Sequence, residues 1–172
     1  MAPTTATERR VNPRPRVREI AVPVAARHFS GLARIDYEDA FVVPGSVPPF
    51  ISCERWARAV MEDTPMTVKA KLLCGWWALG LKVGSPRSHT RVLGWELRRD
   101  EFDCVLLHAG SRLGLSGELL FKREPEGMLF ATFATLDNAA ARAVWARLEG
   151  QHRAVVQSLL GHAARRCDRM QP

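Results

Sequence analysis

The first predicted element is a strand at residues 33–43. Ile35, Tyr37, Phe41 and Val43 share one parity along this segment, and charged residues hold most of the other. Successive side chains of a strand point to opposite faces, so this alternation indicates a half-buried strand. Prolines and a glycine follow directly after Val43 and end it.

A second group of alternating segments lies between residues 91 and 136, where short polar turns separate apolar stretches. The first of these turns is expected at 99–101. Short connections between consecutive strands are typical of an antiparallel sheet. The strands that we predict in this region are 93–97, 104–109, 113–121 and 128–136.

Two helices are predicted between these groups of strands, because apolar residues recur there at spacings of three and four. The first helix begins at Ser52, a good N-cap residue. The second follows Thr64, which is expected to cap it with Pro65 in its first position, and it ends at Gly80. The apolar stripes are Cys53, Trp56 and Val60 in the first helix and Val68, Leu72, Trp76 and Leu79 in the second.

A last helix of roughly 25 residues is predicted after Asp137-Asn138, which cap it. The order of strand, two helices, sheet and long helix predicts an α+β fold in which a curved antiparallel sheet covers one face of the long helix. Such an arrangement leaves a space between the sheet and the helix. The residues on the apolar stripe of the last helix are Ala141, Trp145, Leu148, His152, Val155, Val156 and Leu159.

Composition and charge divide the chain into a leader, one domain and a short tail. Residues 1–26 hold four prolines among clustered arginines and have little to bury, so a flexible basic tail is expected there. The domain is expected at 27–166 and a C-terminal tail at 167–172. The net charge of +7 is concentrated in the two ends. Basic ends keep a protein soluble and contact anionic membranes weakly, and no specific nucleic-acid binding is expected.

Several classes of function lack their sequence signals. The four cysteines lie apart and the five histidines show no ligand spacing, so no metal site, cofactor or disulfide framework is predicted. The chain shows neither a secretory signal nor a membrane span, and a cytoplasmic location is expected. Residues 52–80 superficially suggest a helix-turn-helix, but the second helix carries leucine and tryptophan where base-reading polar side chains are needed.

The chain resembles the START-like (SRPBCC, polyketide cyclase-like) helix-grip superfamily, which includes lipid-transfer domains, and more narrowly an uncharacterised actinobacterial family allied to it. The likeness implies a helix-grip fold with two shorter helices after the first strand. It also implies an apolar ligand held between the sheet and the long helix. It supplies no invariant catalytic set. The stretches that carry it are Asp36-Tyr37-Glu38-Asp39-Ala40-Phe41, Trp56-Ala57-Arg58-Ala59, Arg91-Val92-Leu93-Gly94-Trp95, Thr132-Phe133, and Ala143-Val144-Trp145 to His152-Arg153.

His152 is the most informative candidate, because it interrupts the apolar stripe of the last helix. A buried imidazole needs a hydrogen-bond partner. It is either a core residue bonded to a backbone carbonyl or a sheet threonine, or a polar group that orients an oxygen of a ligand. The residues expected to bind the ligand are Tyr37, Trp56, Trp76, Trp95, Phe133, Trp145, Leu148, His152 and Val155.

Other polar and aromatic residues have simpler expectations. Trp76 and Trp77 are adjacent and point about 100° apart on a helix, so one of them is expected near the surface. Glu96, His108 and Glu118 fall opposite the apolar side chains of their strands and are expected on a solvated face.

Three functions stay open. The leading hypothesis is binding of an apolar small molecule, such as a lipid or a polyketide-like metabolite. The second is a cofactor-independent cyclase, dehydratase or isomerase with His152 as the acid–base group, which requires a second titratable group close by. The third is a peripheral protein that associates with membrane or nucleic acid through its basic ends.

Overall fold

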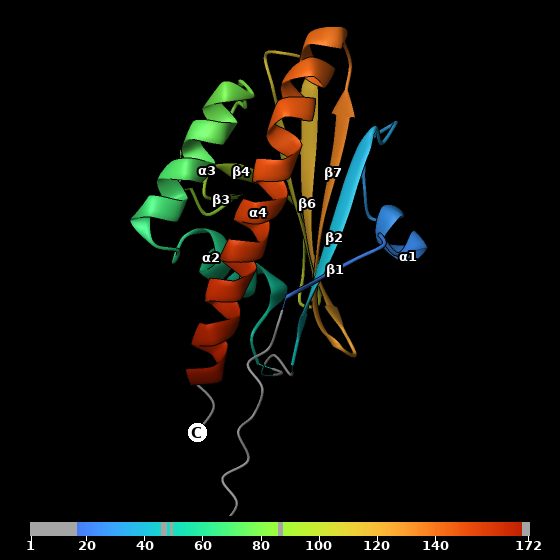
Figure 1. The fold of residues 1–172 in the computed structure, drawn as a ribbon. Helices are drawn as coiled ribbons and strands as arrows, with labels where there is room; N and C mark the ends of the chain where they lie inside the picture. Colours follow the sequence, from blue (N-terminus) through green and yellow to red (C-terminus); the bar gives the residue numbers. More distant parts are fainter. Residues whose placement is uncertain (1–16, 46–47, 49, 86–87, 170–172) are drawn as a thin grey trace, which may run out of the picture.

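A computed structural model describes residues 17–45, 48, 50–85 and 88–169 of the chain. Seven antiparallel strands form one curved sheet in the order β1-β2-β7-β6-β5-β4-β3, and the long helix α4 crosses one of its faces (Figure 1). The predicted α+β architecture with a curved antiparallel sheet and a long final helix is therefore confirmed. The strands are β1 (Arg18–Ile20), β2 (Tyr37–Pro44), β3 (Arg91–Val92), β4 (Trp95–Glu101), β5 (Cys104–Gly110), β6 (Leu115–Glu124) and β7 (Gly127–Leu136).

The helix boundaries follow from local capping. The short helix α1 (Val24–Arg27) comes first, and α2 (Cys53–Met61) begins after Ser52, whose side chain accepts a hydrogen bond from the Arg55 amide as predicted. The predicted cap of α3 (Met66–Ala78) is wrong. Its N-cap is Pro65 in an extended conformation, one residue later than expected, and the hydroxyl of Thr64 is buried without a partner among the described residues.

The last helix, α4 (Ala139–Arg169), is longer than predicted and includes the first residues of the expected tail at 167–172. Asn138 caps it, since its Oδ1 accepts a hydrogen bond of 2.8 Å from the Ala141 amide. Of the helices that the structure describes, none has the length and apolar character that crossing a membrane requires.

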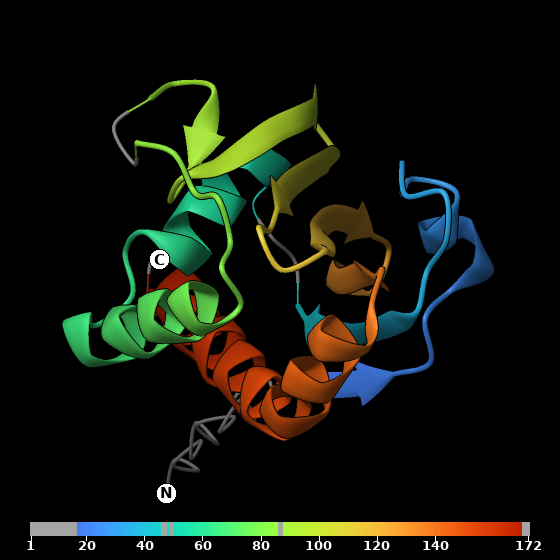
Figure 2. The ribbon, with the colours of Figure 1, turned by 90° about the horizontal axis from the view of Figure 1, so that it is seen from above.

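The sheet buries both of its faces. Phe41 on β2 and Phe130 on β7 lie on the inner face, which packs against α2 and α4, whereas Val42 and Leu129 lie on the outer face. Seen from above, α2, α3 and α4 lie on one side of the sheet and α1 on the other (Figure 2). Residues 20–36, which we name the outer cover, pack on the outer face.

The flexible tail expected at 1–26 is wrong for the residues that the structure describes. Strand β1 pairs with β2 and extends the sheet by one strand. The segment that follows contributes Ile20, Val22 and the buried Ala26 to the outer core. This segment has few apolar residues, but they pack on a sheet face that would otherwise be uncovered. The composition of the segment alone does not reveal that partner. Residues 1–16 of the expected tail lie outside the described residues.

The end of β4 also differs from the expectation. The turn placed at 99–101 belongs to β4, and the chain reverses at Phe102-Asp103 instead. A register shift between Leu97 and Arg99 interrupts the pairing of β4 with β5. An irregularity of this kind breaks the period of two, so the polar residues beyond it look like a turn in the sequence.

Candidate functional site

A cavity lies between the inner face of the sheet and helices α2, α3 and α4. It contains about 660 Å³ of space between atoms, counting its opening to solvent. Its walls are almost entirely apolar, and only Thr132 and His152 interrupt them with polar side-chain groups other than indole nitrogens. The aromatic walls are Trp76 from α3, Trp95 from β4, Phe130 from β7 and Trp145 from α4.

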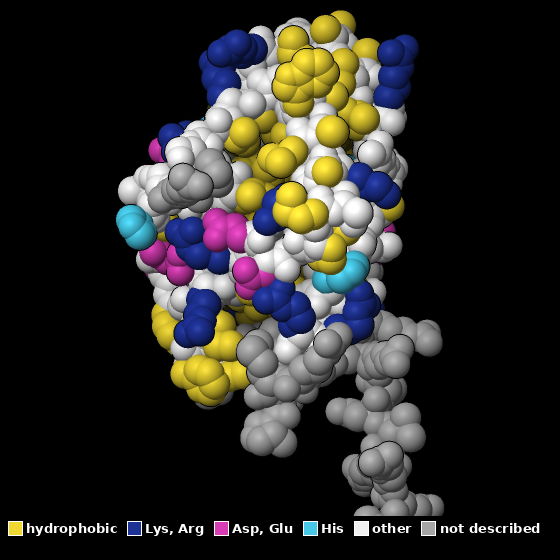
Figure 3. Space-filling view, turned by 90° about the vertical axis from the view of Figure 1, so that its left-hand side faces the viewer, with side chains coloured by type: hydrophobic (Ala, Val, Ile, Leu, Met, Phe, Trp, Pro, Cys, Tyr) yellow, Lys and Arg dark blue, Asp and Glu magenta, His cyan; other side chains and the backbone are white. Residues whose placement is uncertain are grey.

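The cavity opens between α3 and α4. A second hollow of about 410 Å³ shares five side chains with it, among them Trp76, Trp145 and His152. Lys71 and Gln151 are polar residues of this outer part, which we name the mouth. Figure 3 shows the side of the molecule that carries α3, where apolar side chains gather at the surface. A ligand can therefore reach the cavity without opening the sheet.

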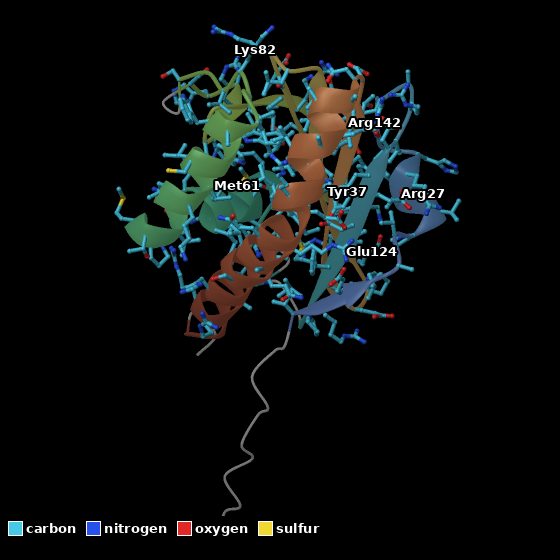
Figure 4. The ribbon with its side chains drawn as sticks, turned by 45° about the horizontal axis from the view of Figure 1, so that its top comes forward. Arg27, Tyr37, Met61, Lys82, Glu124 and Arg142 are labelled. Atoms are coloured by element: carbon cyan, nitrogen blue, oxygen red, sulfur yellow. The ribbon has the colours of Figure 1, made fainter. Side chains whose placement is uncertain are left out.

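His152 is held by a polar network at the edge of the cavity. Its Nε2 lies 3.1 Å from Oδ2 of Asp39 and 3.2 Å from Oγ1 of Thr132. The Tyr37 hydroxyl donates to the same oxygen of Asp39 over 2.6 Å, and Arg153 Nε donates to the Tyr37 oxygen over 3.2 Å. Tyr37 lies between β2 and α4 (Figure 4). Residues from two strands and one helix thus fix the imidazole.

The electrostatics of the network favour an ionised Asp39. Burial alone would raise the pKa of this carboxyl, but the hydrogen bond and charge of His152, with the Tyr37 hydroxyl, keep the pKa below its ordinary value. Burial and the neighbouring Asp39 raise the pKa of Tyr37, which stays a protonated donor. In a neutral imidazole, a proton on Nε2 that points to Asp39 leaves the lone pair on Nδ1. In its neutral form His152 therefore presents Nδ1 as an acceptor.

The structure places the predicted site residues in three groups. Trp76, Trp95, Trp145 and His152 line the cavity. Leu148 and Val155 line the mouth. The other three are not among the residues that line either hollow: Tyr37, Trp56 and Phe133.

The prediction for Phe133 is wrong because of strand parity. Its neighbours Thr132 and Ala134 line the cavity, so Phe133 points to the outer face, where it is fully buried. Trp56 packs edge-on against Phe121, with ring centroids 5.6 Å apart, and belongs to the core below α2. Tyr37 contacts the Trp145 ring at 4.6 Å and acts on the cavity through Asp39 and His152.

Asp39 is the functional residue that the sequence reasoning missed. It stands in the same alternating row as Tyr37, Phe41 and Val43, which face the helices. A carboxylate on an otherwise apolar strand face requires a polar partner. His152 is the polar residue on the otherwise apolar stripe of the last helix. Considering these two exceptions together would have predicted the pair. The sheet threonine expected as a partner of His152 is Thr132.

The tryptophan pair on α3 behaves as predicted. Trp76 is 8% exposed and packs against Trp95, with ring centroids 5.5 Å apart, whereas Trp77 is 84% exposed. The two side chains therefore have separate environments, and only Trp76 contributes to the cavity wall.

The solvated face expected for Glu118 is wrong, because the outer cover buries it. Its Oε2 accepts hydrogen bonds from Ser30 Oγ at 2.7 Å and from the Gly31 amide at 3.0 Å. Nδ1 of the half-buried His108 lies 3.8 Å from Oε1. Burial and the nearby charge of Arg98 lower the pKa of His108. Glu96, by contrast, is exposed as expected.

Among the described residues, no group of three or more histidine, cysteine or acidic side chains is placed to hold a metal ion. Several basic side chains of the C-terminal segment are engaged within the protein. Arg153 pairs with Glu19 and Glu149, and Arg166 pairs with Asp63. These pairs reduce the positive charge that the basic ends offer to a membrane or a nucleic acid.

Comparison with models of protein families, with curated proteins and with solved structures finds no match to this chain. The resemblance to the helix-grip superfamily therefore stays a prediction from the sequence, and the function is argued from the site.

Proposed function

We propose that this protein binds a compact apolar small molecule in the cavity between its sheet and helices α3 and α4. The observation that carries the proposal is the apolar cavity with a mouth to solvent. Protein interiors are normally close-packed, and unfilled space costs stability. An apolar hollow that is walled by four aromatic side chains and carries a few polar groups is typical of a ligand site.

We further propose that the sheet and α4 form a START-like helix-grip fold. The order of elements and the placement of the cavity against the long helix support this interpretation. A cytoplasmic location is part of the same proposal. It is supported by Cys53, Cys74 and Cys104, which are free thiols in the structure.

The proposal is tested by identifying what the protein retains. Protein purified from its own host under native conditions is expected to show, by native mass spectrometry, an added mass that disappears on denaturation. Ala134→Leu places three additional carbon atoms in the cavity wall, since Ala134 lines the cavity and is buried. This variant should lose the added mass while remaining folded.

The matched control is Ala78→Leu, which adds the same atoms at an exposed position near the end of α3. It should retain the ligand. Equal retention by wild-type protein and Ala134→Leu would contradict binding in this cavity, and the absence of any retained or added apolar ligand would contradict the function.

A second candidate function is acid–base catalysis, and Asp39 favours it. The second titratable group that this hypothesis requires lies 3.1 Å from His152. Asp39 would hold the imidazole, and Nδ1 would accept a proton from a ligand in the cavity, as a cyclisation, dehydration or isomerisation needs. In this role His152 is the catalytic residue and Asp39 positions it.

Nitrogen NMR of the histidine rings tests this arrangement without a substrate. The Nε2-protonated tautomer of His152 is expected at neutral pH, and Asp39→Asn should weaken that preference. If the ligand is converted, His152→Gln should abolish turnover and leave ligand binding largely intact. An Nδ1-protonated His152 in wild-type protein would contradict the catalytic arrangement.

A further inference from the structure

Two tryptophans that line the cavity have indole N–H groups without a hydrogen-bond partner in the part of the chain that the structure describes. Trp95 on β4 and Trp145 on α4 both line the cavity and are 4% and 6% exposed. Their Nε1 atoms are fully shielded from solvent and meet no acceptor among the described residues. Buried tryptophan N–H groups normally find a partner, because an unmade hydrogen bond in an apolar interior is costly.

The polar wall residues do not satisfy these donors. Nε2 of His152 is directed to Asp39 and Thr132, and Asp39 accepts from Tyr37 as well. An indole nitrogen donates and does not accept. Nδ1 of His152 is an acceptor, but the buried groups of the wall that lack a partner are the two indole donors, and a ligand that completes them must bring an acceptor.

The charge of the cavity further restricts the ligand. The described residues that line it include no lysine, arginine, aspartate or glutamate. Arg153, the cation of the polar network, is paired with Glu19 and Glu149 and is not among the lining residues. A ligand carboxylate would therefore be buried without a cation, which is strongly unfavourable.

We infer that the ligand is a neutral molecule with an apolar body and at least one carbonyl-type oxygen, such as a ketone or an ester, which accepts from the indole N–H groups of Trp95 and Trp145. This inference rests on the proposed binding function and narrows its ligand class. It excludes a carboxylate buried inside the cavity and predicts that pure hydrocarbons bind more weakly than their ketone analogues.

Three probes with one ring system test the inference by equilibrium dialysis at pH 7.5. 2-Acetylnaphthalene carries the ketone, 2-ethylnaphthalene replaces its carbonyl by a methylene group, and 2-naphthoate carries a charge. Wild-type protein is expected to bind the ketone about tenfold more tightly than the hydrocarbon, because a buried donor gains its acceptor. The carboxylate should bind more weakly than both.

Variants then locate the contact. Trp145→Phe and Trp95→Phe each remove an N–H group and keep an aromatic wall, so at least one of them should reduce the ratio of ketone to hydrocarbon affinity by about fivefold, and the double variant should abolish the preference. Trp56→Phe is the matched control. It makes the same change at a buried tryptophan that does not line the cavity, and it should leave the ratio unchanged.

The outcomes separate this inference from the function on which it rests. If none of the probes binds, the proposed function is overturned. If the hydrocarbon binds as tightly as the ketone, or if the double variant keeps the wild-type ratio, the donor inference is overturned while binding stands. Preferred binding of 2-naphthoate would overturn the requirement for a neutral ligand.

Discussion

Each face of the sheet buries one carboxylate, and the two are used differently. On the inner face Asp39 accepts from Tyr37 and His152 beside a cavity. On the outer face Glu118 accepts from Ser30 and Gly31 of the outer cover. Asp39 orients the His152 side chain beside a cavity, whereas Glu118 holds residues 30 and 31 of the outer cover against a packed core. A buried charge is therefore a sign of function only together with what surrounds it.

The coverings of the two faces differ in the same way. The inner face is covered by helices that leave a cavity, whereas the outer face is covered by the short helix α1 and irregular chain. A long regular helix touches a curved sheet along only part of its length, whereas an irregular segment can follow the surface residue by residue. The comparison predicts that the outer cover contributes stability and the inner face contributes binding.

Removing residues 1–26 is the largest change that tests this comparison. It deletes β1 and all of α1 except Arg27, exposes outer-face residues such as Leu129, and should lower Tm by about 10 °C, corresponding to roughly 3 kcal/mol or more. Thermal unfolding followed by circular dichroism measures it. Removing residues 1–16 leaves every described contact in place and is the control. An unchanged Tm in the longer deletion would show that the outer cover does not stabilise the domain.

Replacing each carboxylate by its amide compares the two faces directly. Asp39→Asn should lower the unfolding free energy by about 1–2 kcal/mol, because the lowered pKa shows that the site favours the ionised form and the new amide protons meet no described acceptor at Oδ1. Glu118→Gln should cost less than about 1 kcal/mol, since its carbonyl keeps both hydrogen bonds and its amide faces His108.

Chemical denaturation at pH 7 measures both amide variants, and the prediction concerns their order. A larger loss for Glu118→Gln than for Asp39→Asn would reverse the roles that we give to the two faces. His152→Leu is a useful addition. It should also destabilise, because it leaves Asp39 buried with Tyr37 as its remaining strong donor.

Periodicity predicted most of the fold, and its failures have physical causes. Strand patterns predicted β2 and β4 to β7, and helical spacing predicted α2, α3 and α4. It missed β1 and α1, because three- and four-residue elements carry too few apolar positions to show a period. Glu118 was misplaced for the same reason, since only the unpredicted outer cover makes its face an interior one.

The candidate site was predicted more completely on the helices than on the sheet, where Trp95 was found but Phe133 was misplaced and Asp39 was missed. His152 and Trp145 were found as members of one stripe, and a stripe identifies its own face. Strand β7 has large apolar residues on both of its faces, so the sequence does not show which face packs against the helices. For this reason Phe133 was wrongly placed in the cavity. Asp39 was missed because pairing between distant residues is decided by tertiary register, which local patterns do not contain.

The two faces of the sheet should lose stability in different pH ranges. The pKa of His108 is lowered from its ordinary 6.5, so the unfolded chain takes up this proton more readily, and stability from the outer face is lost as pH falls below about 6.5. The pKa of Asp39 is lowered from 3.8, so its contribution is present above that value and lost as pH falls below it.

Denaturation at a series of pH values measures the two losses. His108→Gln should flatten the curve between about pH 7 and 5, and Asp39→Asn should flatten it below about pH 4. Part of the acid loss should remain in Asp39→Asn, because Arg34 and the Leu136 amide lower the pKa of Asp36 to about 2. Flattening of the upper window by Asp39→Asn would contradict the assignment.

The smallest predicted effect is also the most specific, because it compares two phenylalanines of one strand that face opposite sides of the sheet. Phe130 lines the cavity and Phe133 lies on the outer face, yet both are buried. Phe130→Leu and Phe133→Leu remove the same ring and should lower stability by similar amounts, about 1 kcal/mol. Phe130→Leu should also weaken binding of 2-ethylnaphthalene about two- to fivefold, since one aromatic wall contact is lost. Phe133→Leu should leave that affinity unchanged. An equal loss of affinity in the two variants would mean that stability and not the cavity wall controls binding, and it would remove the functional distinction between the two faces.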